Sequence, residues 1–384
     1  MKLGGEMLAL LLLPGIALCA CGGGSGGGTV NPPPEQQVAK PTITTVDAQN
    51  GATIVTLAET TSGANIYYTL DGSAPTNASP VYEGPFLVAS NLTLKVIAAE
   101  TGYTNSDVAS QAFSPNIASD TLVWSDEFAN ATGASAGPSA TNWTYDTGTN
   151  CCGNNEKETY CAWGSTTGPC TTSTPNAYVG TDNNLHIVAL NPSANVYTSA
   201  RLKSQGMFSF MYGRIEARMK LPESQGMWPA FWLLGNNIAT INWPACGELD
   251  VMEHIDGNNP PPYAGGQPYG YDWIAGSVHG GTSSTELNGS EQYHATGFSA
   301  AEWHTYGMIW TKGEIQFYID DPTNIYATYK STDATWGANS WPFDQGPQFI
   351  ILNLAVGGDW PGNPDATTVF PGDMTVDYVR IYTN

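Results

Sequence analysis

The chain has 384 residues, 12 of them basic and 34 acidic, so its formal net charge is −22 at pH 7. A protein this acidic repels phosphate backbones and anionic membrane surfaces, which argues against nucleic acid and lipid headgroups as partners and suits a neutral substrate. Only 12% of residues are charged, whereas there are 43 glycines, 26 prolines and 12 tryptophans. This composition is typical of an exported all-β protein, and the length leaves room for two or three domains.

The N-terminus has the pattern of an export signal. Lys2 precedes an apolar run, Met7–Leu18, which is too short to span a bilayer once it is cleaved. Residues 1–20 are therefore predicted to be a signal peptide that sends the protein to the bacterial cell envelope, on the surface or facing the periplasm. Ordinary secretion is the alternative.

Residues 18–21 read Leu-Cys-Ala-Cys and resemble a bacterial lipobox. We expect Cys21 to be lipidated and to become the first mature residue, because the small Ala20 precedes it. Cys19 follows a bulky leucine and is the weaker candidate. Residues 21–37 are rich in Gly and Pro, as a tether from a membrane anchor needs. The lipid would be the chain's one link to a membrane.

Residues 38–115 are predicted to form a small β-sandwich. Alternating apolar runs occupy residues 54–57, 66–70 and 92–97, and Asp71-Gly72 supplies a turn. Short strands separated by turn residues at regular spacing favour such a sandwich.

Residues 64–76 and 98–103 resemble the fibronectin-like module found at the C-terminus of chitobiases and related enzymes. The resemblance leaves two interpretations open. The module either binds glycan through Tyr67, Tyr68 or Tyr103, or it is a spacer whose tyrosines lie in its core. The spacer is favoured.

After a short linker, residues 119–384 are predicted to form a second all-β domain. Long helical patterns are absent, and antiparallel strands at this spacing imply a sandwich or jelly roll. The expected strands are 122–128, 185–190, 214–220, 231–234, 274–279, 303–310, 314–319, 349–354 and 376–382.

Residues 247–254 carry Glu248, Asp250 and Glu253, separated by apolar residues. On a strand, Glu248 and Asp250 point the same way, whereas Glu253 has the opposite parity. A β-bulge at Val251-Met252 would restore the phase and bring all three acids to one face.

Like charges in close contact raise the pKa of one acid, which leaves a protonated carboxyl beside an ionised one. A retaining glycosidase needs such a pair about 5–5.5 Å apart. Residues four strand positions apart are separated by about 13 Å along a straight strand, so this strand must curve. The alternatives for these six residues are a solvated acidic face or a calcium site.

Six segments resemble glycoside hydrolase family 16 in order and spacing, and they are closest to its laminarinase branch. The resemblance covers roughly residues 121–384. The segments are 197–202, 212–218, 227–233, 247–254, 351–362 and 376–381.

This resemblance implies a β-jelly roll whose concave sheet forms the substrate cleft. Glu248 is then the nucleophile, Glu253 the general acid and base, and Asp250 the residue that holds Glu248. The implied protein is a monomeric endo-β-1,3-glucanase that cleaves a laminarin-like polysaccharide. Activities on mixed-linkage glucan, agar or carrageenan share the mechanism. A glucan-binding surface protein without catalysis is the alternative from another class.

Tryptophans flank the acid motif and can provide platforms for the apolar faces of sugar rings. Trp228 and Trp232 are four apart, so on a strand both face one side, and Trp243 follows. By resemblance, Arg201 hydrogen-bonds sugar hydroxyls, with a structural ion pair as the alternative. Asn155 matches a loop at the cleft edge.

Two further side chains are candidates for the cleft. We expect His279 near the acids, where it could support their protonation, although a lone histidine is often a core residue. Asn353, on a late strand of the same sheet, is a candidate substrate contact. His254 follows Glu253 and should point to the opposite face as a structural residue.

The family resemblance also implies a structural calcium ion remote from the chemistry. Its carboxylates would be Glu127 and Asp377, completed by backbone oxygens, because calcium prefers oxygen ligands. Solvated acids are the alternative. No cofactor is expected for catalysis.

Five cysteines follow the predicted lipidation site. Disulfides are expected in an exported protein, and an odd count leaves at least one thiol unpaired. We predict Cys161–Cys170, with a second bridge from Cys151 or Cys152 to Cys246 as a weaker possibility. Cys151-Cys152 also replaces the aromatic-glycine pair that the family has before the Asn155 loop.

Overall fold

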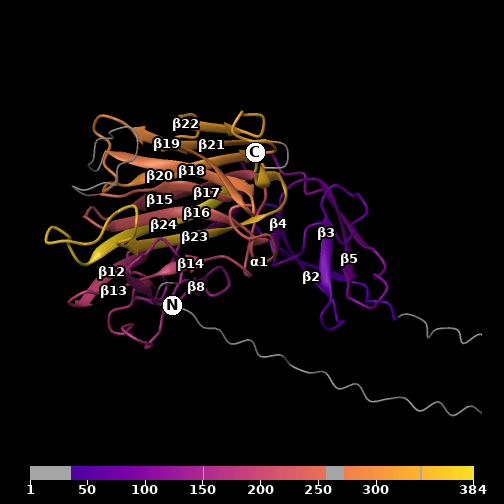
Figure 1. Ribbon diagram of the computed structural model, residues 1–384, viewed down its shortest axis with the longest axis horizontal. Helices are drawn as coiled ribbons and strands as arrows, with labels where there is room; N and C mark the ends of the chain where they lie inside the picture. Colours follow the sequence, from indigo (N-terminus) through magenta and orange to yellow (C-terminus); the bar gives the residue numbers. More distant parts are fainter. Residues whose placement is uncertain (1–35, 150, 257–271, 338–339) are drawn as a thin grey trace, which may run out of the picture. The chain divides into compact units, whose positions relative to one another are not determined.

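Nearly all regular secondary structure is β (Figure 1). Among the residues that the structure describes, the helical segments are α1 (Ile238–Ile241) and the 3-10 helix η1 (Pro342–Asp344). No described helix is long and apolar enough to cross a membrane. The signal peptide and Cys21 lie outside the described residues, as does nearly all of the tether. The computed structural model describes residues 36–149, 151–256, 272–337 and 340–384.

The N-terminal strands form two antiparallel three-stranded sheets, ordered β1-β2-β4 and β3-β5-β6. Val55, Leu94 and Val96 are fully buried between them, which agrees with the predicted sandwich. The strands are β1 (Thr42–Asp47), β2 (Thr53–Ala58), β3 (Asn65–Thr69), β4 (Phe86–Val88), β5 (Leu92–Ala99) and β6 (Ala109–Phe113).

The tyrosines of this module are divided between core and surface. Tyr68 is buried and stacks on Phe86 with 5.5 Å between ring centroids. Tyr67 is half-buried, and Tyr103 is exposed. The core position expected in the spacer interpretation is therefore found for Tyr68 and not for Tyr103.

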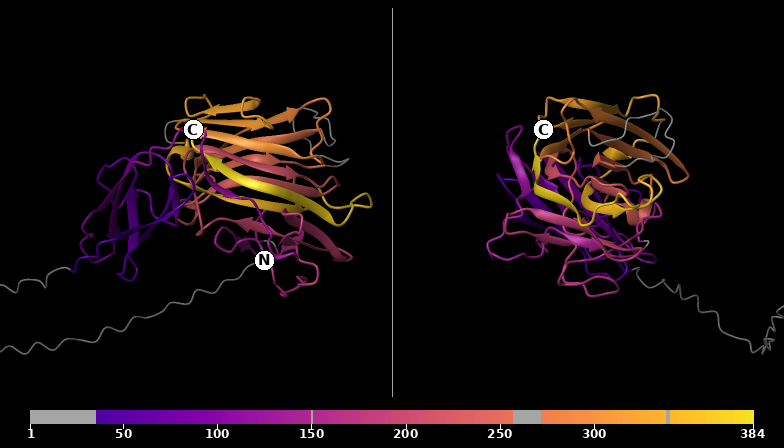
Figure 2. Two further views of the ribbon diagram at one scale, coloured as in Figure 1. Left: turned by 180° about the vertical axis from the view of Figure 1, so that it is seen from behind. Right: turned by 90° about the vertical axis from the view of Figure 1, so that its left-hand side faces the viewer.

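The larger domain is a sandwich of two sheets with eleven and seven strands. Figure 2 shows the two sheets from behind and from the side. The eleven-stranded sheet runs β22-β21-β20-β15-β24-β12-β13-β10-β9, with β7 beside β24 and β11 beside β12. Its strands are β7 (Leu122–Asp126), β9 (Gly148–Thr149), β10 (Glu158–Tyr160), β11 (Ala177–Val179), β12 (Leu185–Ser193), β13 (Val196–Ser199), β15 (Gly213–Lys220), β20 (His304–Thr311), β21 (Glu314–Ile319), β22 (Ile325–Lys330) and β24 (Gly372–Tyr382).

The seven-stranded sheet carries the acid motif and runs β19-β18-β17-β16-β23-β14-β8. Each strand predicted for this domain overlaps an observed one, and β21 has the predicted bounds. The strands of this sheet are β8 (Thr144–Asp146), β14 (Arg201–Lys203), β16 (Met227–Gly235), β17 (Glu248–Glu253), β18 (Trp273–Thr282), β19 (Thr285–His294) and β23 (Gln348–Val356).

Alternation along β16 separates the core of the sandwich from the outer face of the seven-stranded sheet. Phe231 and Leu233 are fully buried in the core shared by both sheets. Trp228 and Trp232 have the opposite parity and line a cleft on the other face. The strand starts earlier than predicted because both of its faces are apolar, which hides the alternation from the sequence.

Candidate active site

A β-bulge in β17 brings the three acids to one face. Trp232 on β16 pairs with Asp250, and the next residue, Phe231, pairs with Met252, so Val251 has no partner of its own. Val251 and Met252 are both buried in the core. The predicted bulge is thus confirmed, and Glu253 recovers the parity of Asp250.

The neighbouring strand accommodates this bulge with a glycine. Asp250 pairs with Ser277 and Glu253 with Ala275, so Gly276 alone faces the two bulged residues. A Cβ atom at Gly276 would collide with the ring of Phe317 on the other sheet. Glycine therefore lets β18 pass close to the core at the point where β17 bends.

The acids lie in a cleft of about 360 Å³. Tryptophans and polar side chains from β14, β16 and β23 share it with β17. The residues expected there from sequence that do line it are Glu248, Asp250, Glu253, Arg201, Trp228, Trp232, Trp243 and Asn353.

The electrostatics of the cleft separate the two glutamates. Burial raises the pKa of Glu253 well above its ordinary value, and the charge of Asp250 adds to this effect. Burial and Asp250 also raise the pKa of Glu248, to about 8, although the positive charges of His279 and Arg201 oppose them. Both glutamates therefore hold a proton more readily than usual, and the larger rise at Glu253 suits a general acid.

His279 lies beside Asp250, as expected. Its Nε2 is 3.2 Å from Oδ2 of Asp250, and its Nδ1 is 2.8 Å from Oε1 of Glu286. Burial alone would lower the pKa of His279, but the hydrogen bond and charge of Asp250 outweigh it and raise the pKa to about 10. The imidazolium thus supplies a fixed positive charge next to the acid cluster.

The two tryptophans of β16 are held by hydrogen bonds from their indole nitrogens. Nε1 of Trp228 donates to Oε1 of Glu253 at 2.9 Å, and Nε1 of Trp232 donates to Oδ1 of Asn353 at 2.7 Å. Trp228 also packs edge-on against Trp360, with centroids 5.4 Å apart. Both indoles are thereby fixed in orientation, which a sugar platform requires.

Arg201 forms the ion pair that the sequence left as one alternative, and it also lines the cleft. Its Nε donates to Oδ2 of Asp146 at 3.1 Å, and its guanidinium carbon lies 4.6 Å from the centre of the Trp232 ring. It lines the cleft while it forms this ion pair. Trp243 is 44% exposed at the cleft edge, tilted against His279.

The loop of Asn155 lies at the cleft edge, as the resemblance implied, but the Asn155 side chain turns to another partner. Its Nδ2 donates to both carboxylate oxygens of Asp359 at 2.9 Å, and the side chain does not line the cleft. Asn154 and Glu156 line it instead. Gly153, Asn154 and Asn155 all have positive φ, so this loop does not follow the alternation of an extended strand.

Two of the five cysteines pair in a way that the sequence did not suggest. Cys161–Cys170 is confirmed, but the second disulfide joins the neighbours Cys151 and Cys152. Cys246 is a buried free thiol, so the bridge proposed to it is wrong. Cys152 lines the cleft at the position where the family has its aromatic-glycine pair.

The residues expected to bind calcium do not fit a calcium site. Both oxygens of Glu127 accept hydrogen bonds from Arg380, at 2.9 and 2.8 Å, and Asp377 accepts one from Arg218 at 2.7 Å. Guanidinium groups thus supply the positive charge that a cation would bring. Among the described residues, the one metal-like cluster is Glu248, Asp250 and His279, with ligand atoms within 4.8 Å of one another.

His254 is structural, as expected from its parity. It is fully buried, and its Nδ1 lies 3.0 Å from the carbonyl oxygen of Trp273. Burial lowers the pKa of His254 to about 4, so the ring is neutral at physiological pH.

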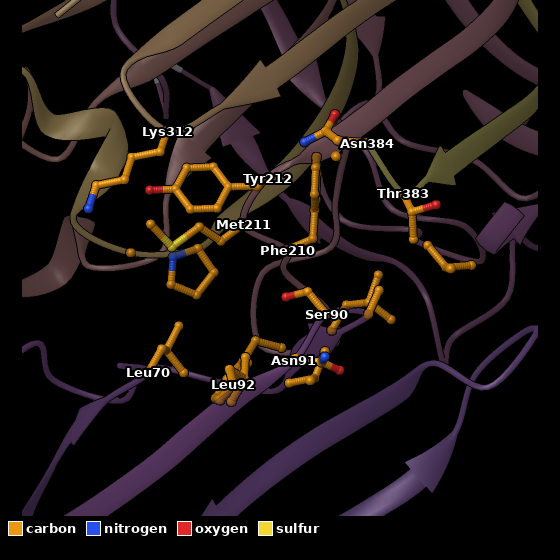
Figure 3. Close-up of a pocket in the computed structure, with 18 of the residues that line it drawn as sticks. Leu70, Ser90, Asn91, Leu92, Phe210, Met211, Tyr212, Lys312, Thr383 and Asn384 are labelled. Atoms are coloured by element: carbon orange, nitrogen blue, oxygen red, sulfur yellow. The ribbon is translucent and has the colours of Figure 1, made fainter. Parts of the chain in front are cut away.

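A larger pocket, of about 790 Å³, lies away from the acids. Figure 3 shows Leu70, directly after β3, and Leu92, at the start of β5, with Phe210, Met211 and Tyr212 also lining the space. Its two acidic lining residues already accept hydrogen bonds, Asp344 from the Tyr212 hydroxyl at 3.1 Å and Asp71 from the Ser73 hydroxyl at 2.6 Å. The smaller cleft holds three acids on one strand, so the chemistry is assigned there.

Comparisons with known proteins agree with this geometry. The model for glycosyl hydrolases family 16 matches residues 164–380, and the model described as Fn3 associated matches residues 55–113. The beta-glucanase of Rhodothermus marinus is 34% identical over 68% of this chain and 84% of its own length. The keratan-sulfate endo-1,4-beta-galactosidase of Sphingobacterium multivorum is 33% identical over 68% of this chain, but over only 54% of its own length.

Among solved structures, the laminarinase catalytic domain of Thermotoga maritima superposes with a TM-score of 0.56 at 32% identity. The match covers 70% of this chain and 99% of that domain. The bulged acid strand, the tryptophan-lined cleft and the family match over more than half of the chain lead to one assignment. The chain is a glycoside hydrolase and belongs to glycosyl hydrolases family 16.

Proposed function

We propose that the protein is a retaining endo-β-1,3-glucanase that acts on laminarin-like polysaccharide. The observation that carries this proposal is the bulge that places Glu248 and Glu253 on one face, with Asp250 between them, in a tryptophan-lined cleft. The beta-glucanase and laminarinase relatives support the glucan substrate.

The first chemical step transfers a proton and forms a covalent bond. Glu253 protonates the glycosidic oxygen while a carboxylate oxygen of Glu248 attacks the anomeric carbon, so the sugar–oxygen bond breaks. The indole of Trp228 donates to Oε1 of Glu253, which leaves Oε2 to carry the proton. His279 favours the ionised form of Glu248, which the attack requires.

The second step returns both acids to their starting states. Glu253, now ionised, takes a proton from water, and the hydroxide oxygen attacks the anomeric carbon of the glycosyl–Glu248 ester. Glu248 leaves as a carboxylate, and the product has the configuration of the substrate. His279, beside Asp250, offsets part of the negative charge that Asp250 adds between the two glutamates.

Product analysis on laminarin, lichenan, agarose and carrageenan tests this proposal, with Glu248→Gln as the control. Oligosaccharides from laminarin that disappear in the variant support it. Release from lichenan or a galactan alone keeps the acid pair and replaces the substrate. Sulfated galactans are disfavoured because the chain carries a net charge of −22.

A glucan-binding surface protein without catalysis is the second candidate. It predicts that wild type and Glu248→Gln bind laminarin equally and that neither releases product. The raised pKa of Glu253 beside an ionisable Glu248 favours the enzyme, because binding alone does not require a protonated acid in the cleft.

Export and membrane anchoring are a further part of the proposal, which the lipobox at residues 18–21 supports. Cys21→Ser should release the protein from the detergent-rich phase in a Triton X-114 partition, whereas Cys19→Ser should not. Equal partitioning of all three proteins would reject the anchor. We also propose that the enzyme works as a monomer, which light scattering tests.

A structural calcium ion, inferred from the family resemblance, would have to displace Arg380 from Glu127 and Arg218 from Asp377. Thermal unfolding in calcium and in chelator distinguishes a calcium-bound site from one in which the arginines pair with the two acids. A higher Tm in calcium supports the ion, and an unchanged Tm supports the arginine pairs.

A further inference from the structure

A second pair of acidic side chains lies beside the catalytic acids and takes no part in the chemistry above. Glu156 lines the cleft and is 7% exposed, and Glu158, at the start of β10, is 1% exposed. Neither acid forms an ion pair with a described lysine, arginine or histidine. Two buried carboxyl groups two residues apart are costly if both are ionised.

Glu158 has one carboxyl oxygen satisfied and one unsatisfied. Its Oε2 accepts a hydrogen bond from the backbone N–H of Val356 at 2.7 Å. Its Oε1 is buried without a hydrogen-bond partner among the described residues, and Glu156 is the neighbouring acid that acts on this side chain. A proton on Oε1 resolves the conflict, because Glu158 can then donate to Glu156.

The surroundings of Glu158 favour this protonated form. Burial raises the pKa of Glu158 to about 8, and the charge of Glu156 adds to the effect. The charged and titratable groups that act on the adjoining hydroxyl of Tyr160 are Glu158, Glu156 and Arg201. Arg201 lies over Trp232 and pairs with Asp146, so it does not neutralise the glutamates by contact.

Glu156 is also the end of a hydrogen-bond chain that begins at a cleft tryptophan. Nε1 of Trp232 donates to Oδ1 of Asn353 at 2.7 Å. Nδ2 of Asn353 donates to the Tyr160 hydroxyl at 3.4 Å, and that hydroxyl donates to Oε2 of Glu156 at 2.9 Å. All donors point the same way, toward one carboxylate, and such chains strengthen their members.

We propose that Glu156 and Glu158 share one proton and, through Tyr160 and Asn353, position Trp232 for substrate binding. Glu158 holds the proton, and Glu156 is the carboxylate that orients the chain. Both are positioning residues, since neither acts on the reacting atoms. The role assigned to Trp232 as a sugar platform rests on the proposed function.

The protonation of Glu156 and Glu158 affects the cleft wall because backbone hydrogen bonds tie their segment to Val356 and Asp359. The N–H of Lys157 donates to the carbonyl oxygen of Val356, and the N–H of Asp359 donates to that of Asn154, both at 2.8 Å. Loss of the shared proton puts two negative charges in contact inside this bonded segment. The repulsion displaces the wall that carries Asn154 and Glu156, and substrate binding weakens.

The measurable consequence is a KM that rises at alkaline pH independently of kcat. Between pH 7 and 9, the wild-type KM for laminarin oligosaccharides should rise about five- to tenfold, as expected when one charge-assisted hydrogen bond is lost. The alkaline limb of kcat belongs to Glu253 and should stay in place in the variants below.

Glu158→Gln is the decisive variant because its amide can donate to Glu156 while its oxygen accepts from Val356, without any titration. Its KM at pH 6.5 should lie within twofold of wild type, and its KM should not rise up to pH 9. Tyr160→Phe should raise KM about five- to tenfold at every pH, with kcat changed less than threefold.

A KM rise that persists in Glu158→Gln, or an unchanged KM in Tyr160→Phe, overturns the proposal. Thermal unfolding establishes that each variant is folded. If Glu158→Gln does not fold, Glu156→Gln replaces it, since it also removes the repulsion and should abolish the alkaline rise.

A binding measurement in an inactive variant tests the shared proton independently of the proposed hydrolytic activity. In a Glu248→Gln background, the Kd of laminarihexaose measured by tryptophan fluorescence should follow the same pH dependence, and Glu158→Gln should remove it. Absence of hydrolysis by the wild type would reject the proposed activity, whereas a pH-independent Kd would reject the shared proton.

Discussion

The indole Nε1 of Trp228 lies 2.9 Å from Oε1 of Glu253 and donates a hydrogen bond to it. One tryptophan thus lines the sugar cleft and also tunes the general acid. The hydrogen bond stabilises the ionised form, so it partly offsets the burial that raises the pKa of Glu253. Platform and acid strength are coupled through this one contact.

Trp228→Phe should keep the platform and remove the hydrogen bond. The pKa of Glu253 then rises further, so the alkaline limb of the kcat/KM profile should move up by as much as about one pH unit, and kcat should fall about tenfold. Trp232→Phe is the matched control because its indole bonds Asn353 instead. An equal shift in both variants would contradict the assignment of the bond to Glu253.

His279→Asn should move the acidic limb of kcat/KM to higher pH. The imidazolium lowers the pKa of Glu248, so its loss raises that pKa, and the nucleophile is ionised only at higher pH. The pH profile of kcat/KM measures the shift. Glu286→Gln should give a smaller shift in the opposite direction, because it removes a negative charge that raises the pKa of Glu248 while Asp250 keeps His279 charged. An acidic limb that stays in place in His279→Asn would show that the histidine does not act on Glu248.

His254 should make the fold less stable in acid. Burial lowers its pKa from 6.5 to about 4, so between these values the unfolded chain binds the extra proton and stability rises with pH. Lowering the pH from 7 to 4.5 should therefore cost about 2–3 kcal/mol through this residue. Urea unfolding of wild type and His254→Asn at both pH values measures this loss of unfolding free energy. Between pH 7 and pH 4.5, the variant should lose less unfolding free energy than wild type, and the difference should equal the contribution of His254. Equal losses would show that the ring titrates normally.

The two disulfides should affect different properties. Cys161–Cys170 closes a loop with a sequence separation of 9, so replacing both with serine should cost about 2–3 kcal/mol of unfolding free energy. Cys151–Cys152 joins neighbours and constrains little of the unfolded chain, but Cys152 lines the cleft. Replacing this pair should raise KM several-fold with little change in Tm. A lowered Tm with unchanged KM would show that the pair only supports the fold.

Local spacing accounts for the success of sequence reasoning at the catalytic centre. The parity of Glu248, Asp250 and Glu253 required a bulge, and the register of β16 against β17 contains it at Val251. Because the alternation of a strand is a local property, it predicted many of the strands of the sandwich and the shared face of the two tryptophans on β16.

Backbone conformation limited the same reasoning at the cleft edge. Asn154 and Asn155 both have positive φ, which the alternation of strands does not anticipate. The family resemblance pointed to Asn155, whereas Asn154 and Glu156 are the residues of this loop that line the cleft. The pattern Glu156-x-Glu158-x-Tyr160 was the available signal for this missed group, since residues two apart on a strand share a face.

By itself the sequence determined the β class, the strand positions, the acid triad and its bulge, because each depends on residues within a few positions of one another. Only the tertiary structure decided which partners meet across the sheets. Trp232 and Asn353 are 121 residues apart, and Glu127 and Arg380 are 253 apart. Such contacts depend on the register of strands brought together by the whole fold, as does the unbridged Cys246.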